Sequence, residues 1–164
     1  MKLPVGHHLR HAREDDHRAI VEAIGRWWGG HGPHLTLLMP RLFLQHFAGT
    51  SWVVDSEAGE LGAFLVGFRS QDHPEEAYIH FVGVDPELRH GGLGRGLYEL
   101  FFEQMRELGC TEVHAITGPP NRVSQEFHAA MGFTAHGDEP VEGVMAYRDY
   151  DGPGEHRVAF SRTL

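Results

Sequence analysis

The chain has 164 residues, of which 41% are hydrophobic, and 23 acidic against 14 basic residues give it a formal net charge of −9. This length fits one domain, residues 1–164, and the single cysteine, Cys110, excludes an intrachain disulfide. The acidic balance argues against nucleic-acid binding. Because we find neither an apolar run of about 18 residues nor a leader at the start, we expect no membrane association and a cytoplasmic protein.

The first half of the chain predicts an alternation of strands and amphipathic helices. Residues 9–12 read as a strand, and Asp15 or Asp16 can cap the helix that follows. The glycine-rich run 29–33 ends this helix, and 40–47 predicts a second, short one. Strands are expected at 51–55, 61–68 and 77–84. One face of the first helix carries Ala19, Ile20, Ala23, Ile24, Trp27 and Trp28.

The second half predicts a long helix, a strand, a shorter helix and two more strands, at 92–108, 112–117, from 121, 133–136 and 156–162. The segment 136–155 is long for a compact domain, which is typical of lids and binding loops. Its acidic residues, and those at 72–76, serve either solubility or the attraction of amines. Fourteen histidines are scattered, and the pair His31 and His34 lacks a second ligand cluster, so no metal is expected.

The most informative run joins the strand ending at Val84 to the long helix. Glycines leave backbone N–H groups accessible, and a helix N-terminus carries partial positive charge, so such a turn suits a phosphate. The residues concerned are Arg89, His90, Gly91, Gly92, Gly94, Arg95 and Gly96.

Several interpretations of this turn can be tested against its sequence. A Walker loop requires Gly-Lys-Ser/Thr, which Arg95 and Gly96 do not provide. A dinucleotide fingerprint requires a third glycine where Leu97 stands. There remain a different phosphate-binding turn and a glycine-rich turn without a ligand.

The pattern Arg89-x-x-Gly92-x-Gly94 behind residues 82–86 resembles motif A of the GNAT N-acetyltransferase superfamily, whose Gln/Arg-x-x-Gly-x-Gly/Ala turn holds the pyrophosphate of acetyl-CoA. Residues 121–133 resemble its motif B, Asn-x-x-Ala/Ser-x-x-Phe-Tyr followed by Gly-Phe. Element order extends the resemblance over 9–136. It implies an α/β (α+β) fold with a central mixed, mostly antiparallel sheet, splayed at the cofactor site and covered by helices on both faces.

The resemblance also implies that acetyl-CoA binds as a cosubstrate, with its pantetheine arm along the strand that ends at Val84. Gly83 would then allow close approach or a bulge. An N–H near Val82 would contact the oxyanion. The implied cofactor contacts are Val82, Val84, Arg89, His90, Gly91, Gly92, Gly94, Arg95, Asn121, Phe127 and His128.

Candidate catalytic residues lie on the strand before the turn and in motif B. Strand alternation predicts that Tyr78, His80 and Val82 share a face. Histidine has a reference pKa near 6.5, which suits His80 as a general base. Superfamily members that act on arylalkylamines carry histidines at the positions of Tyr78 and His80. Histone-modifying members carry a glutamate at the position of Tyr78. His128 stands where the family often has tyrosine, so it is either the acid for the departing thiolate or a cofactor-packing residue. Cys110 reads as a small buried hydrophobe, with a nucleophile as the alternative.

The leading hypothesis is therefore an acetyl-CoA-dependent N-acetyltransferase whose acceptor, a primary amine of a small molecule, peptide or protein, attacks directly in a ternary complex. The alternatives are a non-catalytic acyl-CoA-binding module on the same fold and an interaction domain without cofactor. Trp27, Trp28, residues 34–47 and the long loop are expected to line the acceptor pocket. A homodimer is a family-level expectation.

Overall fold

A computed structural model describes residues 1–164, apart from the side chain of Pro33. Seven strands form one sheet in the order β1-β2-β3-β4-β5-β9-β6. β4 and β5 pair in parallel, and the other neighbours pair antiparallel, so the sheet is mixed and mostly antiparallel as predicted. The strands are β1 (His7–His11), β2 (Trp52–Ser56), β3 (Leu61–Arg69), β4 (Glu76–Val84), β5 (Glu112–Thr117), β6 (Thr134–His136) and β9 (Val158–Thr163).

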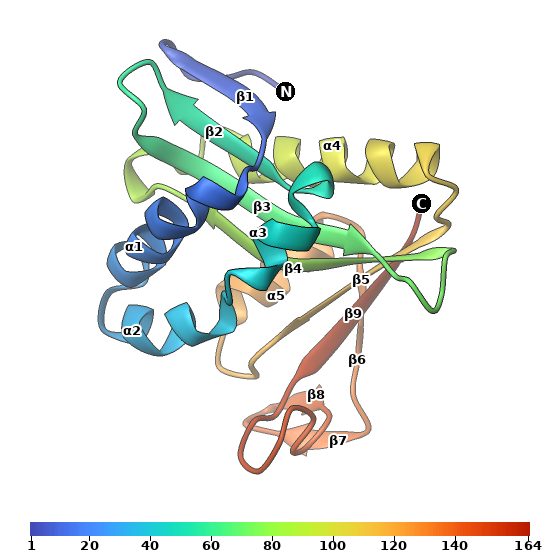
Figure 1. Cartoon of the computed structure of the whole chain (residues 1–164). Helices are drawn as coiled ribbons and strands as arrows, with labels where there is room; N and C mark the ends of the chain where they lie inside the picture. The colour runs from blue at the N-terminus through green and yellow to red at the C-terminus, as the bar shows by residue number, and fades with distance from the viewer.

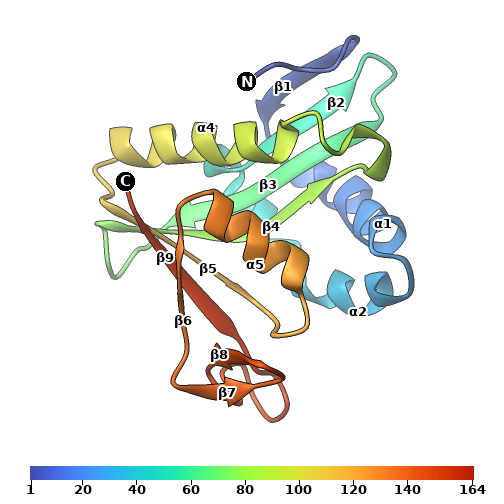
Figure 2. The same cartoon turned by 180° about the vertical axis from the view of Figure 1, so that it is seen from behind.

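Helices cover both faces of this sheet. One face carries the helices that precede β2 in the chain (Figure 1), and the other carries the two that follow β4 (Figure 2). The first group is α1 (His17–Trp27), α2 (Gly32–Leu35) and α3 (Leu42–His46), and the second is α4 (Leu93–Glu107) and α5 (Arg122–Ala130).

Two hydrophobic clusters fix these layers. On the α1 face, Ile20 and Ile24 pack with Phe64 and Val66 of β3. On the α4 face, residues spaced at helical intervals pack against Leu65 and Ile79, including Leu97, Phe101 and Met105. The predicted apolar face of α1 is confirmed except for Ala19, which is exposed.

Some local predictions need correction. Asp16 precedes α1 as predicted, but its side chain makes no cap hydrogen bond. Its carboxylate instead accepts from the Arg13 N–H at 2.7 Å and from the Arg10 guanidinium at 2.7 and 2.8 Å, so both oxygens bind donors that precede Asp16 in the chain. The segment 136–155 also contains a hairpin, β7 (Glu139–Val141) and β8 (Val144–Ala146).

The sheet opens between β4 and β5. Their pairing covers three residue pairs, from Glu76 with Glu112 to Tyr78 with His114, and then stops. At the same point β4 bulges against β3, since Val66 pairs with Phe81 while Gly67 pairs with Ile79, which leaves His80 as the extra residue. The splay implied by the family resemblance is therefore present, and its apex lies beside His80.

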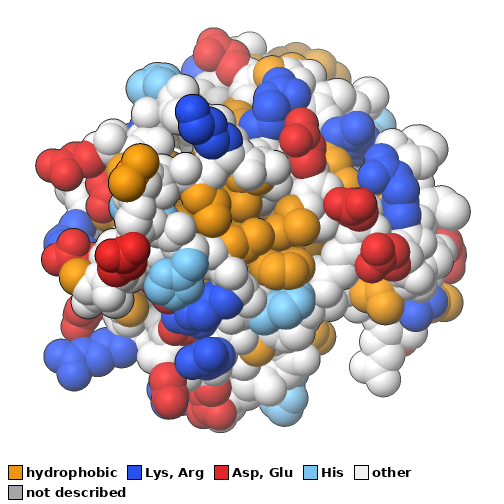
Figure 3. All heavy atoms as spheres, turned by 90° about the horizontal axis from the view of Figure 1, so that it is seen from above, with side chains coloured by type: hydrophobic (Ala, Val, Ile, Leu, Met, Phe, Trp, Pro, Cys, Tyr) orange, Lys and Arg blue, Asp and Glu red, His pale blue; other side chains and the backbone are white. Residues whose placement is uncertain are grey.

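Other surfaces offer less chemistry. Seen from above, apolar side chains gather between charged ones (Figure 3). At this end, a hollow of about 280 Å³ beside α4 is lined by Met1, Leu3, Leu9 and Leu100 together with two carboxylates, Glu99 and Glu103. No helix among the described residues is long and apolar enough to cross a membrane.

Candidate active site

The glycine-rich turn presents free backbone donors at the start of α4. Gly92, the residue before the helix, has a φ of 84°, and His90 has a φ of 66°, so both are left-handed. The first hydrogen bond of α4 runs from the Gly96 N–H to the Gly92 carbonyl. Among the described residues, the N–H groups of 92–95 therefore have no hydrogen-bond acceptor. A helix of 15 residues adds its positive N-terminal end. The turn therefore fits a phosphate group.

The two arginines that flank the turn are occupied within the chain. Arg89 donates through Nε to the Val84 carbonyl at 3.1 Å and through Nη2 to the Trp27 carbonyl at 3.3 Å. Arg95 donates to the Ala130 carbonyl at 3.3 Å and pairs with Glu99 at 3.6 Å. The guanidinium of Arg89 thus links the end of β4 to the end of α1 by hydrogen bonds. One of its acceptors is the carbonyl of Val84, whose backbone the resemblance assigned to the cofactor arm.

Residues of both motifs meet beside the start of α4. A Cβ on Gly94 would lie 3.6 Å from the Phe127 ring and 3.7 Å from Val84 Cγ2, so the turn, α5 and the end of β4 meet at this glycine. Asn121 caps α5 by accepting from the Ser124 N–H at 3.1 Å, as predicted. The structure thus brings Gly94 of motif A next to Phe127 of motif B.

His80 occupies the bulge at the apex of the splay. Its ring stacks on Phe43 with 3.8 Å between centroids, and its Nε2 lies 2.5 Å from the Leu38 carbonyl oxygen. Because a carbonyl only accepts, Nε2 carries the proton and Nδ1 keeps its lone pair. Burial lowers the pKa of His80 below 6.5 and outweighs the opposite effect of the Leu38 hydrogen bond. At pH 7 the ring is therefore neutral, and Nδ1 is its basic atom.

The predicted alternation along β4 is right up to the bulge and wrong beyond it. Tyr78 and His80 share the α3 face, where Tyr78 stacks on Phe68 at 5.6 Å. Val82 packs with the α4 cluster on the opposite face, because the extra residue reverses the alternation.

Gly83 does not form the bulge. It allows close approach instead, since a Cβ there would collide with the Phe64 ring and lie 3.0 Å from Trp28.

His128 is held in the core instead of facing the splay. It is 5% exposed, and its ring stacks on Phe160 at 4.5 Å. Nδ1 donates to the Ser124 carbonyl at 2.7 Å, so Nε2 is the acceptor for the Tyr98 hydroxyl at 3.1 Å. Burial lowers the pKa of His128. Both ring nitrogens are engaged and the ring is neutral, which removes the basis for the predicted acid role.

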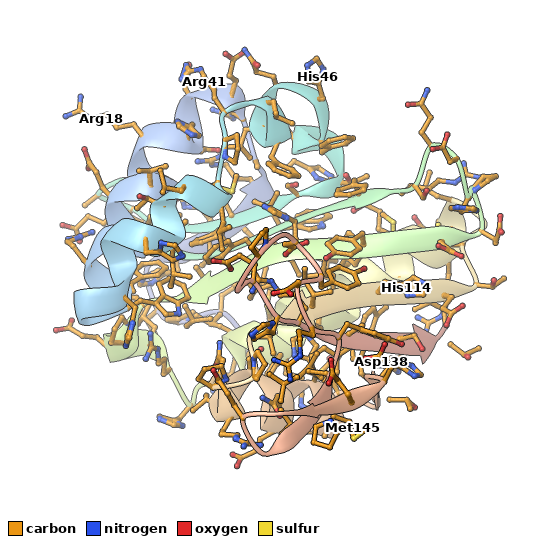
Figure 4. The ribbon with its side chains drawn as sticks, turned by 90° about the horizontal axis from the view of Figure 1, so that it is seen from below. Arg18, Arg41, His46, His114, Asp138 and Met145 are labelled. Atoms are coloured by element: carbon orange, nitrogen blue, oxygen red, sulfur yellow. The ribbon has the colours of Figure 1, made fainter. Side chains whose placement is uncertain are left out.

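A pocket of about 280 Å³ lies next to the apex, where β4 and β5 are still paired. His114 of β5, labelled in Figure 4, is one of its lining residues. Its lining includes Phe68, Ser70, Glu76, Tyr78, His114, Ile116, Tyr150 and Phe160.

Of the predicted acceptor-pocket residues, only the long loop contributes to this lining, through Tyr150. Trp27 is 8% exposed and packs on Phe64, and Trp28 packs edge-on against Phe81, because the core takes both rings. The segment 34–47 contributes Leu38 and Phe43 to the surroundings of His80 instead.

Cys110 is buried, as predicted, and burial raises its pKa, which keeps the thiol protonated. Sequence reasoning missed Tyr150 and Tyr98. Tyr98 follows Leu97 in the long helix and gave no polar signal, since its partner His128 lies 30 positions away. An aromatic residue inside an acidic loop was the signal for Tyr150.

Comparison with known proteins is consistent with this arrangement. A protein-family model described as acetyltransferase (GNAT) family matches residues 11–133. L-2,4-diaminobutyric acid acetyltransferase of Nocardia farcinica (strain IFM 10152) is 26% identical over 90 residues, which are 55% of this chain and 46% of that protein. The chain thus aligns with about half the length of this curated relative.

Two solved structures share the fold. Ard1 from Thermoplasma volcanium is 18% identical with a TM-score of 0.72, covering 98% of this chain and 99% of its own. Diaminobutyrate acetyltransferase EctA from Paenibacillus lautus, solved with L-2,4-diaminobutyric acid and coenzyme A, is 18% identical with a TM-score of 0.67, covering 94% and 93%. The matched residues include the glycine-rich turn, the splayed strands and α5, and the chain belongs to the acetyltransferase (GNAT) family.

Proposed function

We propose that the chain is an N-acetyltransferase that moves the acetyl group of acetyl-CoA to a primary amine. The observation that carries this proposal is the junction of a phosphate-binding turn, a splayed strand pair and a histidine with a free basic nitrogen at the apex. Acetyl-CoA supplies the pyrophosphate and the thioester. The N–H groups of 92–95 suit the pyrophosphate, and the backbone of β4 beyond Tyr78, which β5 no longer pairs, suits the amide-bearing arm.

The chemical step requires a neutral amine and a proton acceptor. We assign the acceptor to Nδ1 of His80, directly or through one water, because Nε2 is already donating to Leu38. The amine nitrogen forms a bond to the thioester carbon, the carbon–sulfur bond breaks, and the amine proton leaves to His80. Binding both reactants at the apex makes the attack effectively intramolecular.

A proton donor for the departing sulfur is assigned to Tyr78. Burial raises the pKa of Tyr78 well above its ordinary value of 10, so its hydroxyl stays protonated and can donate. Tyr78 shares the face of His80, whereas His128 is fully hydrogen-bonded elsewhere and takes no part in the proposed step.

Two measurements test this function together. Calorimetry with acetyl-CoA measures binding, and release of free CoA thiol with a panel of primary amines measures transfer. We expect both, with transfer strongly reduced in H80Q while binding is kept. Absence of acetyl-CoA binding refutes the proposal, and binding without thiol release across the panel indicates the non-catalytic module instead.

The acceptor class, a small-molecule or peptide amine, is part of this proposal. Two of the proteins named above are named as acetyltransferases of diaminobutyric acid, a small-molecule amine, and one of these two was solved with coenzyme A. A homodimer and a cytoplasmic location stay predictions, which light scattering and cell fractionation test.

A further inference from the structure

The pocket next to the apex has aromatic walls. Phe68 and Tyr78 stack with 5.6 Å between ring centroids, and Tyr150 from the loop after β8 and Phe160 of β9 also line the pocket. Tyr150 is 53% exposed although it lines the pocket, so its ring is accessible to a ligand. Aromatic faces attract cations as well as apolar groups.

One end of the pocket is formed by a carboxylate. Glu76 lines it, and Nε2 of His114 lies 3.7 Å from both the Glu76 and the Glu112 carboxylates without a recorded hydrogen bond among the described residues. The formal charge of this group is −2 with His114 neutral and −1 with it protonated. The adjacent β3–β4 turn adds Glu75, whose carboxylate can come within 4.8 Å of the Glu76 carboxylate.

The loop that carries Tyr150 is also negative. Arg157 pairs with Asp151 at 2.7 Å and with Glu155 at 2.8 Å, so these three groups sum to −1. Asp149 adds another negative charge beside Tyr150, and Arg148, which precedes it, is paired with Glu139 at 2.9 Å. Arg69 donates to the Pro74 carbonyl at 2.6 Å in the β3–β4 turn. Within the described part of the chain, the pocket lining itself therefore contains carboxylate and no lysine or arginine.

We infer that the acceptor carries a second ammonium group, which the Glu76 end of the pocket and the Tyr78 and Tyr150 rings bind, and that it carries no carboxylate. This inference rests on the proposed function, because it assumes that the amine to be acetylated lies at the apex. Glu76 is four residues from His80 along β4, about 13 Å of strand. A flexible aliphatic diamine fits this separation, whereas the carboxylate of a diamino acid would face Glu76 without a cation to bind it.

Matched amines test the inference by thiol release. Diamines of five to eight methylenes are compared with the monoamines of equal length, and 1,5-diaminopentane is compared with L-lysine, which differs by one carboxylate. One partly exposed ion pair with cation–π contacts predicts about a tenfold higher kcat/KM for the diamine of the best-matched length, and a preference for 1,5-diaminopentane over L-lysine. Equal kcat/KM within every pair, or preference for the diamino acid, overturns the inference.

Variants localise the effect. E76Q is expected to bring the diamine-to-monoamine ratio close to one, and Y150L to lower it more than Y150F does. E107Q is the matched control, since it makes the same chemical change at the exposed end of α4 and is expected to leave the ratio unchanged. A ratio that E76Q does not change overturns the assignment of this pocket.

A binding measurement separates this inference from the proposed function. Hexyltrimethylammonium cannot be acetylated, and calorimetry measures its affinity for the unsubstituted chain and for the variants. We expect E76Q to weaken its binding about tenfold and E107Q to leave it unchanged. If no amine releases thiol while E76Q weakens this binding, the proposed function fails and the ammonium site stands; if thiol release occurs without any preference for diamines, the inference fails and the function stands.

Discussion

Substitutions at Gly94 should change acetyl-CoA binding without weakening the fold. A Cβ at this position would be in ordinary van der Waals contact with Phe127 and Val84, at 3.6 and 3.7 Å, so G94A fits without displacement. The longer side chain of G94L would extend into the space beside the turn that the proposed cofactor site requires. Because Gly94 is helical, both substitutions should keep or raise the free energy of unfolding, by up to about 1 kcal/mol.

The expected effect on the cofactor has the opposite sign. Preventing one or two charge-assisted hydrogen bonds to the pyrophosphate costs about 1.5–3 kcal/mol each, which is at least a tenfold weaker acetyl-CoA affinity for G94L. G94A should bind within a few-fold of the unsubstituted chain. Calorimetry with acetyl-CoA and thermal denaturation measure the two effects separately.

G25L is the matched control for this experiment. Gly25 lies within α1 and a Cβ there meets nothing within 4 Å, so its replacement should stabilise the chain similarly and leave acetyl-CoA binding unchanged. Unaltered acetyl-CoA affinity in a folded G94L protein would refute the placement of the cofactor at this turn. Loss of folding in G94A would refute the packing geometry.

Three further predictions concern the histidines and the α5 cap. In H80Q we expect turnover to fall by a factor of about 10²–10⁴. In the unsubstituted chain, kcat/KM should fall as the pH drops through the lowered pKa of His80, because the neutral ring is the base. The pH–rate profile of H80Q should lack this fall. The pKa of His128 is lower in the folded chain, so its contribution to the free energy of unfolding is complete above pH 6.5 and is lost as the pH falls towards the folded pKa. This loss amounts to at most about 1.4 kcal/mol per pH unit. Urea unfolding between pH 7 and 5 measures it, and H128F should lack it. N121A should lower the unfolding free energy by about 1 kcal/mol through loss of the cap, measured by thermal denaturation, and an unchanged melting temperature would contradict that role.

Local sequence signals predicted the elements and the turn well, because their causes lie within a few residues. Asn121 caps α5 through the N–H three residues on, and Gly92 adopts the left-handed conformation that ends a turn and starts a helix. The strand at Glu112–Thr117 was predicted with the same bounds, since its alternating apolar residues are bounded by polar turns.

Features that depend on residues far away in the chain could not be predicted from local sequence signals. A bulge at His80 exists only relative to β3, so counting along β4 alone placed Val82 on the wrong face. His128 was compared with a tyrosine of the family, but the Tyr98 hydroxyl and the Phe160 ring, which determine its environment, come from other elements. Arg89 was expected to face the phosphate, and the Trp27 carbonyl that receives it is 62 positions earlier.

The bulge connects the opening of the sheet with the two faces of the proposed reaction. Pairing of β4 with β5 ends at Tyr78, and the extra residue in β4 follows two positions later, at His80. A bulge increases the local twist of its strand, which turns the second half of β4 away from β5 and leaves its outward backbone groups without a strand partner. Alternation from Tyr78 directs His80 towards α3, and the extra residue places Val82 and Val84 on the α4 face. A donor lying in the splay and an amine arriving from the pocket at Tyr78 would therefore meet at His80, where the bulge changes the face on which the following residues of β4 lie.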